Sequence, residues 1–195
     1  MKALQTLPVG YSEIYKVNLQ KDKRIAVLIN ILAVLIGVAM AVPMHFYIPI
    51  STLFDMEKGM LNYFLRFAVL FFSIIVYMIL HELIHGVTMK ICGSENVKYG
   101  FTGLYAFAGS EDYYNKKEYI AITLAPVILF FFVFLVLCFM LPKEWFWVVY
   151  FLQITNISGA AGDFFVAVKF LQFPKDILIS DCGVEMTVFS KQKIK

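Results

Sequence analysis

Long runs of hydrophobic residues, separated by short polar segments, dominate this chain. A helix rises about 1.5 Å per residue, so roughly 20 apolar residues are needed to cross a hydrocarbon core of about 30 Å. Stretches of suitable length cover residues 25–43, 67–89, 119–141 and 145–168. The pattern therefore predicts an all-α polytopic membrane protein with about four transmembrane helices.

Polar residues interrupt two of these four runs. The first and third runs contain no charged residue, whereas the second contains His81, Glu82 and His85, and the fourth contains Asn156 and Asp163. An ionisable side chain inside a span costs about 2.5 kcal/mol or more on insertion scales, so it needs a compensating partner. These five residues are therefore the first candidates for chemistry.

The segments outside the runs contain weaker, β-type patterns. Residues 98–109 alternate small with large apolar side chains, which is typical of an extended or hairpin segment. This segment is either an edge strand that binds substrate or a loop on the membrane interface. In the tail, residues 173–195, two apolar stretches at 177–179 and 184–189 indicate short strands. With no internal repeat or long linker, we expect one integral membrane domain over residues 1–195.

Composition narrows the function classes. Of 195 residues, 61% are hydrophobic and only 16% are charged, which excludes an ordinary soluble enzyme and a disordered chain. A net charge of +3 is too small to indicate a nucleic-acid partner. Cys92, Cys138 and Cys182 are odd in number and widely separated, so a disulfide framework is not expected.

The first hydrophobic run also has to be compared with a cleaved signal peptide, because Ala39-Met40-Ala41 resembles a cleavage site. The run begins only after 24 mostly polar residues and is longer than a usual signal sequence core, which favours an uncleaved membrane helix.

The distribution of Lys and Arg residues predicts the orientation of the helices in the membrane, because short cytoplasmic connections are enriched in these residues. One side, formed by both terminal segments and the connection after the second run, holds fourteen: Lys2, Lys16, Lys21, Lys23, Arg24, Lys90, Lys98, Lys116, Lys117, Lys169, Lys175, Lys191, Lys193 and Lys195. The other side holds Lys58, Arg66 and Lys143. We expect a multi-pass protein of the cell membrane with both termini in the cytoplasm.

Residues 81–85 form an HExxH motif. Two histidines four residues apart lie about 6 Å apart along one helix face, where both can bind one metal ion beside the intervening Glu82. The alternative is that His81 and His85 are polar residues satisfied by neighbouring helices or water. A divalent cation better explains three ionisable groups within five residues of a span.

A catalytic zinc site usually has three protein ligands, so a third ligand is expected at a matching membrane depth. Asp163 is the only acidic residue in the other three runs. It lies six residues before Lys169, and the His81–His85 pair is centred seven residues before Lys90, so the two depths agree. Asp163 could instead be a protonated or hydrogen-bonded carboxyl group between helices. Glu111 and Asp112, in the connecting loop, are the alternative ligands.

The chain resembles the site-2 protease-like intramembrane zinc peptidases, and more closely the small bacterial zincin peptidases allied to them. His81-Glu82-Leu83-Ile84-His85-Gly86 is similar to the metal motif of that group, and Leu124-Ala125-Pro126 is similar to its AGP-type element. Asn156 and Asp163 resemble its downstream asparagine and aspartate ligand. The segment Ala161-Gly162-Asp163-Phe164 replaces the usual Leu-Asp-Gly form, and no proline lies between Asn156 and Asp163.

These observations predict a zinc metalloendopeptidase with one Zn²⁺ per chain, held by His81, His85 and Asp163, with Glu82 as the general base. Asn156, one or two helical turns from Asp163, is a candidate donor to the substrate or the oxyanion. The expected substrate is a membrane protein or peptide in the lipid bilayer, cut near the cytoplasmic face. The alternatives are a non-catalytic protein that binds or transports a divalent cation, and an inactive scaffold. Substrate identity and oligomeric state stay open.

Overall fold

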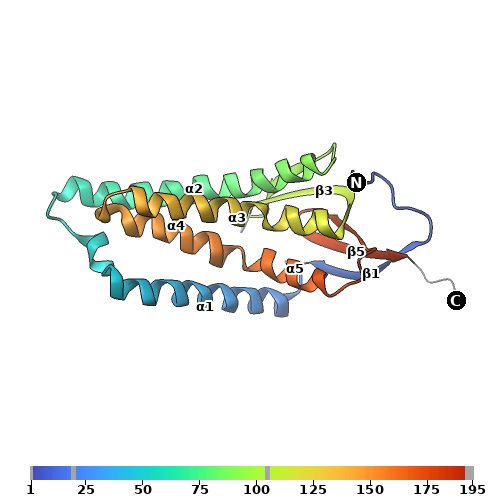
Figure 1. The fold of residues 1–195 in the computed structure, drawn as a ribbon, viewed down its shortest axis with the longest axis horizontal. Helices are drawn as coiled ribbons and strands as arrows, with labels where there is room; N and C mark the ends of the chain where they lie inside the picture. The colour runs from blue at the N-terminus through green and yellow to red at the C-terminus, as the bar shows by residue number, and fades with distance from the viewer. Residues whose placement is uncertain (1, 19–20, 104–105, 192–195) are drawn as a thin grey trace. The chain divides into compact units, whose positions relative to one another are not determined.

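The computed structural model describes residues 2–18, 21–103 and 106–191 of the chain (Figure 1). Long helices alternate with short strands. The helices are α1 (Lys23–Tyr47), α2 (Met60–Ile91), α3 (Lys116–Met140), α4 (Phe146–Gly159) and α5 (Ala161–Leu171), with short 3-10 helices η1 (Ile50–Phe54) and η2 (Lys143–Trp145). The strands are β1 (Tyr11–Asn18), β2 (Lys98–Phe101), β3 (Ala106–Asn115), β4 (Leu178–Asp181) and β5 (Glu185–Lys191).

The five strands form one antiparallel sheet in the order β1-β5-β4-β3-β2. Of the two alternatives for residues 98–109, an extended or hairpin segment and an interfacial loop, the structure has the first, as β2 and the start of β3. The strands expected in the tail are confirmed as β4 and β5. Strand β1 was not expected, because half of its residues are polar and they do not alternate strictly with the apolar ones. The sheet therefore contains the N-terminal segment, the connection after α2 and the tail. Leu104, Tyr105 and residues 192–195 lie outside the described residues.

The chain forms two compact units. The first contains Met1–Leu28, Leu80–Pro126 and Asp163–Lys195, and the second contains Ile29–Ile79 and Val127–Gly162. Helices α1, α2, α3 and α5 contribute residues to both units, so each unit is described separately.

In the first unit, a single apolar core joins the sheet to three helices. Met89 of α2, Tyr119 and Ile122 of α3, and Phe170 of α5 are all at most 1% exposed, and they pack together with strand residues such as Ile179. Burial of large side chains on one face of the sheet fixes the positions of these three helices. The sheet thus supports the helical segments that contain the candidate metal ligands.

In the second unit, α4 packs against the segments around η1. Trp147 is fully buried, and its Nε1 atom donates hydrogen bonds to the carbonyl oxygens of Ile48 and Pro49 at 3.1 and 3.2 Å. Lys58 and Glu144 form an ion pair that joins the connection before α2 to η2. These two connections therefore lie together.

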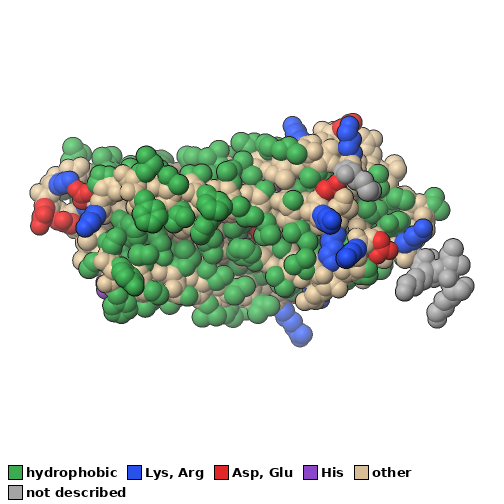
Figure 2. All heavy atoms as spheres, in the orientation of Figure 1, with side chains coloured by type: hydrophobic (Ala, Val, Ile, Leu, Met, Phe, Trp, Pro, Cys, Tyr) green, Lys and Arg blue, Asp and Glu red, His purple; other side chains and the backbone are tan. Residues whose placement is uncertain are grey.

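Four helical segments are long and apolar enough to cross a membrane: Lys23–Tyr47, Met60–Ile91, Lys116–Met140 and Lys143–Leu171. They coincide with the four predicted runs and extend most of them. On the face shown in Figure 2, hydrophobic side chains cover the helices, and charged side chains gather over the sheet and beside the start of α2. An apolar surface of this kind is typical of helices that contact lipid.

The sequence predicted one continuous helix for the fourth run, but the structure has two helices there. The run is interrupted at Ala160, whose φ and ψ of −80° and 14° end α4, and α5 begins at Ala161. Gly159 and Gly162 flank the interruption, and glycine has a low helix propensity. Asn156 and Asp163 therefore lie on different helices, and the expectation that they are one or two turns apart on one helix is wrong.

Candidate metal centre

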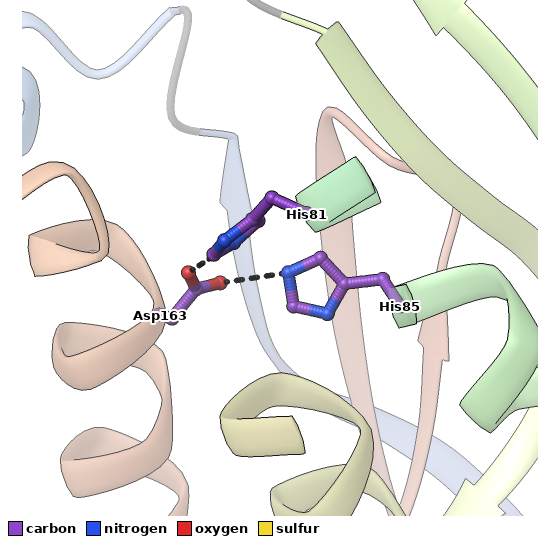
Figure 3. A group of neighbouring side chains, drawn as sticks. All are labelled: His81, His85 and Asp163. Carbon is purple, nitrogen blue, oxygen red and sulfur yellow. Dashed lines mark ion pairs between the residues drawn. The ribbon is translucent and has the colours of Figure 1, made fainter. Parts of the chain in front are cut away.

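His81 and His85 lie on one face of α2, as expected for a spacing of four residues. Both side chains are buried, each residue being 9% exposed, and their ring centroids lie 4.8 Å apart. Asp163 reaches them from a second helix. The three side chains point toward one another, two from α2 and one from α5 (Figure 3).

The interruption of the fourth run places Asp163 in the first turn of α5. The N-terminus of a helix has a partial positive charge and stabilises a carboxylate nearby. Gly159 and Gly162, on either side of the break, have a low helix propensity, which favours an interruption of the helix there. The local sequence thus presents a stabilised carboxylate to the two histidines.

The distances between the donor atoms fit one small metal ion. The Nε2 atom of His81 lies 3.4 Å from Oδ2 of Asp163, and Nε2 of His85 lies 3.6 Å from Oδ1. One donor atom from each of the three residues lies within 4.8 Å of the other two. Two ligands held about 2.0–2.2 Å from a tetrahedral zinc ion lie roughly 3.3–3.6 Å apart. Each imidazole therefore lies at this spacing from the carboxylate, and two imidazoles with one carboxylate are a suitable donor set for zinc.

Glu82, between the two histidines in sequence, is directed toward the sheet. Its carboxyl group interacts with the backbone N–H group of Ala108 in β3, and it lies within electrostatic reach of His85 and Asp163. It is not among the three clustered ligands. This position, beside the ligands and anchored by a backbone donor, is suited to a group that handles a proton.

The hairpin of β2 and β3 packs on the same stripe of α2. Gly86 follows Glu82 by four residues, and the Tyr99 side chain of β2 occupies the space that a Cβ atom on Gly86 would need. Tyr99 is paired with Ala108 in the hairpin, which is the residue that contacts Glu82. Glycine after the HExxH motif therefore permits close contact between the hairpin and the helix.

The imidazole of His85 has a second partner on α3. Its Nδ1 atom lies 2.9 Å from the carbonyl oxygen of Ile122. Since a carbonyl oxygen only accepts hydrogen bonds, Nδ1 carries the proton and Nε2 is left with its lone pair. That lone pair is on the nitrogen that lies near Asp163.

A buried acidic residue that was not predicted from the sequence, Asp181, lies close to this cluster. Tyr119 donates a hydrogen bond to its Oδ2 atom at 2.6 Å, and the backbone N–H of Gly183 donates to Oδ1 at 2.7 Å. Burial raises the pKa of Asp181, while these two bonds and His85 act in the opposite direction. Asp181 comes from β4, so only strand pairing brings it here.

The alternative ligands have other partners. Glu111 forms an exposed ion pair with Lys98 at 2.6 Å. Asp112 accepts hydrogen bonds from the hydroxyl groups of Ser94 and Ser110 at 2.5 and 3.0 Å. Within the described residues, neither belongs to the group formed by His81, His85 and Asp163.

Asn156 belongs to the second unit, where it is fully buried. Its Oδ1 atom accepts a hydrogen bond from the Tyr77 hydroxyl group, and its Nδ2 atom donates to the Val127 carbonyl oxygen, both at 3.0 Å. The amide thus joins α4 to α2 and α3. Its role as a donor to a substrate or an oxyanion stays a prediction.

Comparison with known proteins identifies the family of this chain. Residues 74–178 match the model of a family described as "putative zincin peptidase". The chain belongs to this family. The match contains α3 and α5 together with the part of α2 that holds both histidines, so it includes every member of the candidate metal centre. No curated protein and no solved structure matches the chain significantly.

The family and the donor set agree on a metal, because a zincin peptidase implies zinc and imidazole and carboxylate groups are common zinc ligands. The sequence identified the three clustered residues, but it missed the Ile122 carbonyl, Asp181 and the contact between Tyr99 and Gly86. Of these three features, only the free Ile122 carbonyl could have been predicted from the sequence. Pro126 interrupts an otherwise apolar helix and frees a carbonyl group four residues before it.

Proposed function

We propose that this zincin family member is an integral membrane zinc metalloprotease, similar to site-2 proteases, that hydrolyses peptide bonds of membrane-associated substrates near the cytoplasmic face. One observation carries the proposal. His81, His85 and Asp163 converge at zinc-ligand spacing within helices apolar enough to cross a membrane, with Glu82 beside them.

His81 and His85 would hold zinc through Nε2, and Asp163 through a carboxylate oxygen. A zinc ion bound there would supply a Lewis acid for the substrate carbonyl and lower the pKa of a coordinated water to about 7. Glu82 would accept a proton at its carboxylate as water attacks the peptide carbonyl carbon. The same carboxyl group would then return the proton to the leaving nitrogen as the C–N bond breaks.

Strand pairing supports the proposal that three segments of the chain lie together on the cytoplasmic side. The sheet contains the N-terminal segment, the connection after α2 and the tail, the three segments that contain fourteen of the Lys and Arg residues in the sequence. The connections around Lys58 and Glu144 are paired with each other instead. Four membrane crossings require the same grouping, with both termini and the connection after α2 in one group and the other two connections in the second.

The hairpin offers a place for the substrate. Strand β2 is at the edge of the sheet. Its Tyr99 side chain lies against Gly86 of α2, the residue that follows His85. An extended peptide added to an exposed edge gains backbone hydrogen bonds. A membrane-spanning substrate would have to unwind to bind in this way, so we propose that unwound or flexible segments are cleaved.

The decisive experiment compares wild type with Glu82→Gln, and uses Glu111→Gln as a matched control at an exposed site. Zinc content and cleavage of a membrane-embedded test substrate are measured in the same lipid. We expect equal zinc in all three proteins, and cleavage reduced at least about 100-fold only in Glu82→Gln. Equal cleavage by wild type and Glu82→Gln would refute the protease mechanism. Loss of zinc from Glu82→Gln, with no cleavage by any protein, would favour a cation-binding protein.

A further inference from the structure

Pro126 lies inside α3 and changes the hydrogen bonding of the helix at one carbonyl group. In an α-helix the N–H group of each residue bonds the carbonyl oxygen four residues earlier, and proline has no N–H group. The Ile122 carbonyl is therefore without its usual helical donor. Ile122 is only 1% exposed, and Pro126 is less than 2% exposed, so this carbonyl needs a donor from the protein.

His85 is the donor, through the 2.9 Å contact between Nδ1 and the Ile122 oxygen. The bond has two consequences for the imidazole. It requires the tautomer with the proton on Nδ1, which leaves the lone pair on Nε2, and it fixes the rotation of the ring. Both are conditions for Nε2 to bind a metal together with Asp163.

We propose that Pro126 is a positioning residue for the metal centre: by lacking an N–H group, it reserves the Ile122 carbonyl for His85 and so holds that imidazole ready to bind zinc. This inference rests on the proposed function. An alanine at position 126 would offer its N–H group to the same carbonyl. Although a carbonyl can accept two bonds, the helical bond draws it along the helix axis and away from His85.

Three variants separate the missing N–H group from the shape of proline. Pro126→Ala restores the donor. An ester at position 126, made by incorporating the α-hydroxy acid that corresponds to alanine, has the alanine side chain but no N–H group. Pro43→Ala removes the proline from α1, in the other unit, and is the matched control for loss of a helix proline.

Zinc affinity of the full-length protein, measured in detergent by competition with a chelator, is the main readout. Loss of a partner that orients a ligand typically lowers metal affinity 10–100-fold. We expect Pro126→Ala to bind zinc at least about tenfold more weakly than wild type, and we expect wild-type affinity for the ester and for Pro43→Ala.

The tautomer of His85 gives a readout without metal. The chain has three histidines, so ¹⁵N spectra of histidine-labelled, zinc-free protein are simple to assign by comparison with His45→Gln and His81→Gln. We expect the Nδ1-protonated form of His85 in wild type and in the ester, and a mixture of tautomers in Pro126→Ala.

Each result decides the inference. Unchanged affinity and tautomer in Pro126→Ala would overturn it while leaving zinc binding by wild type intact. Equal weakening in Pro126→Ala and in the ester would also overturn it, because the ring of proline would then matter rather than the missing N–H group. If Pro126→Ala does not fold, the ester alone decides: wild-type affinity supports the inference and a tenfold loss overturns it. A wild type that binds no zinc would refute the metal site itself.

Discussion

The Nε2 atom of His85 lies 3.6 Å from the Oδ1 atom of Asp163, although the two residues belong to different helices, α2 and α5. His81 is placed equally well, with its Nε2 atom 3.4 Å from Oδ2 of the same carboxylate. One carboxylate thus faces two imidazoles, which is a geometry that one divalent cation can bridge. Four properties can be measured: the metal content, the topology, the role of Asn156 and the pH dependence of stability.

The first concerns metal content. Wild-type protein purified in detergent should contain about one zinc per chain, and His81→Ala, His85→Ala and Asp163→Ala should each lose most of it, because each removes one of three ligands. Elemental analysis measures this, and Asp112→Asn is the control, since Asp112 bonds Ser94 and Ser110. Full zinc occupancy in Asp163→Ala would show that the third ligand is another residue.

The second concerns topology. Single cysteines introduced near Lys98 and Lys175 should react only with reagents that reach the cytoplasm, and a cysteine near Met56 only with reagents outside. The native cysteines Cys92, Cys138 and Cys182 are replaced first, because all three are free thiols. Labelling of the Lys98 site from outside would reverse the orientation and the side from which water and substrate enter.

The third concerns Asn156. Its buried amide bonds the Tyr77 hydroxyl group and the Val127 carbonyl oxygen, so Asn156→Ala should lower the free energy of unfolding by about 1–3 kcal/mol, and Tyr77→Phe by less. Denaturation in mild detergent gives these values. Cleavage per folded molecule is compared in the same samples. A loss of cleavage in Asn156→Ala that Tyr77→Phe does not share would support the predicted role as a donor to the substrate.

The fourth concerns pH. Burial raises the pKa of Asp181, so the folded protein favours the protonated carboxyl group more than the unfolded chain does. This contribution to stability is full below the ordinary aspartate pKa of about 3.9 and is lost as the pH rises through the raised value. Asp181→Asn has no such group. The melting temperature of wild type should therefore fall relative to Asp181→Asn as the pH rises above about 4.

A constant difference between the two melting temperatures from pH 4 to 8 would contradict this prediction. Zinc-free protein is used for both, so that metal loss at low pH does not enter the comparison. Tyr119→Phe is a useful third protein, because it removes the 2.6 Å hydrogen bond to Asp181 that opposes the rise in pKa. Its stability should fall more steeply with increasing pH than that of wild type.

The sequence by itself determined the four apolar runs that are long enough to cross a membrane and the three candidate metal ligands that cluster in the structure. Both follow from local rules: the length of an apolar run, and the spacing that places His81 and His85 on one helix face. Asp163 could be paired with them because an acidic residue in a span is costly and its depth can be counted from Lys169. Alternation along residues 98–109 also indicated an extended or hairpin segment, although it left an interfacial loop as the alternative.

Only the tertiary structure decided the rest, because it depends on contacts between residues far apart in the chain. The segment Tyr11–Asn18, which lacks strict alternation, becomes a strand because β5 is available to pair with it. Asp181 comes close to His85 because β4 pairs with β3, which packs against α2. Pro126 can be read from the sequence, and so can the carbonyl that it frees at Ile122. That His85 is the donor to this carbonyl depends on how α3 packs beside α2, which the spacing of residues along one helix cannot predict.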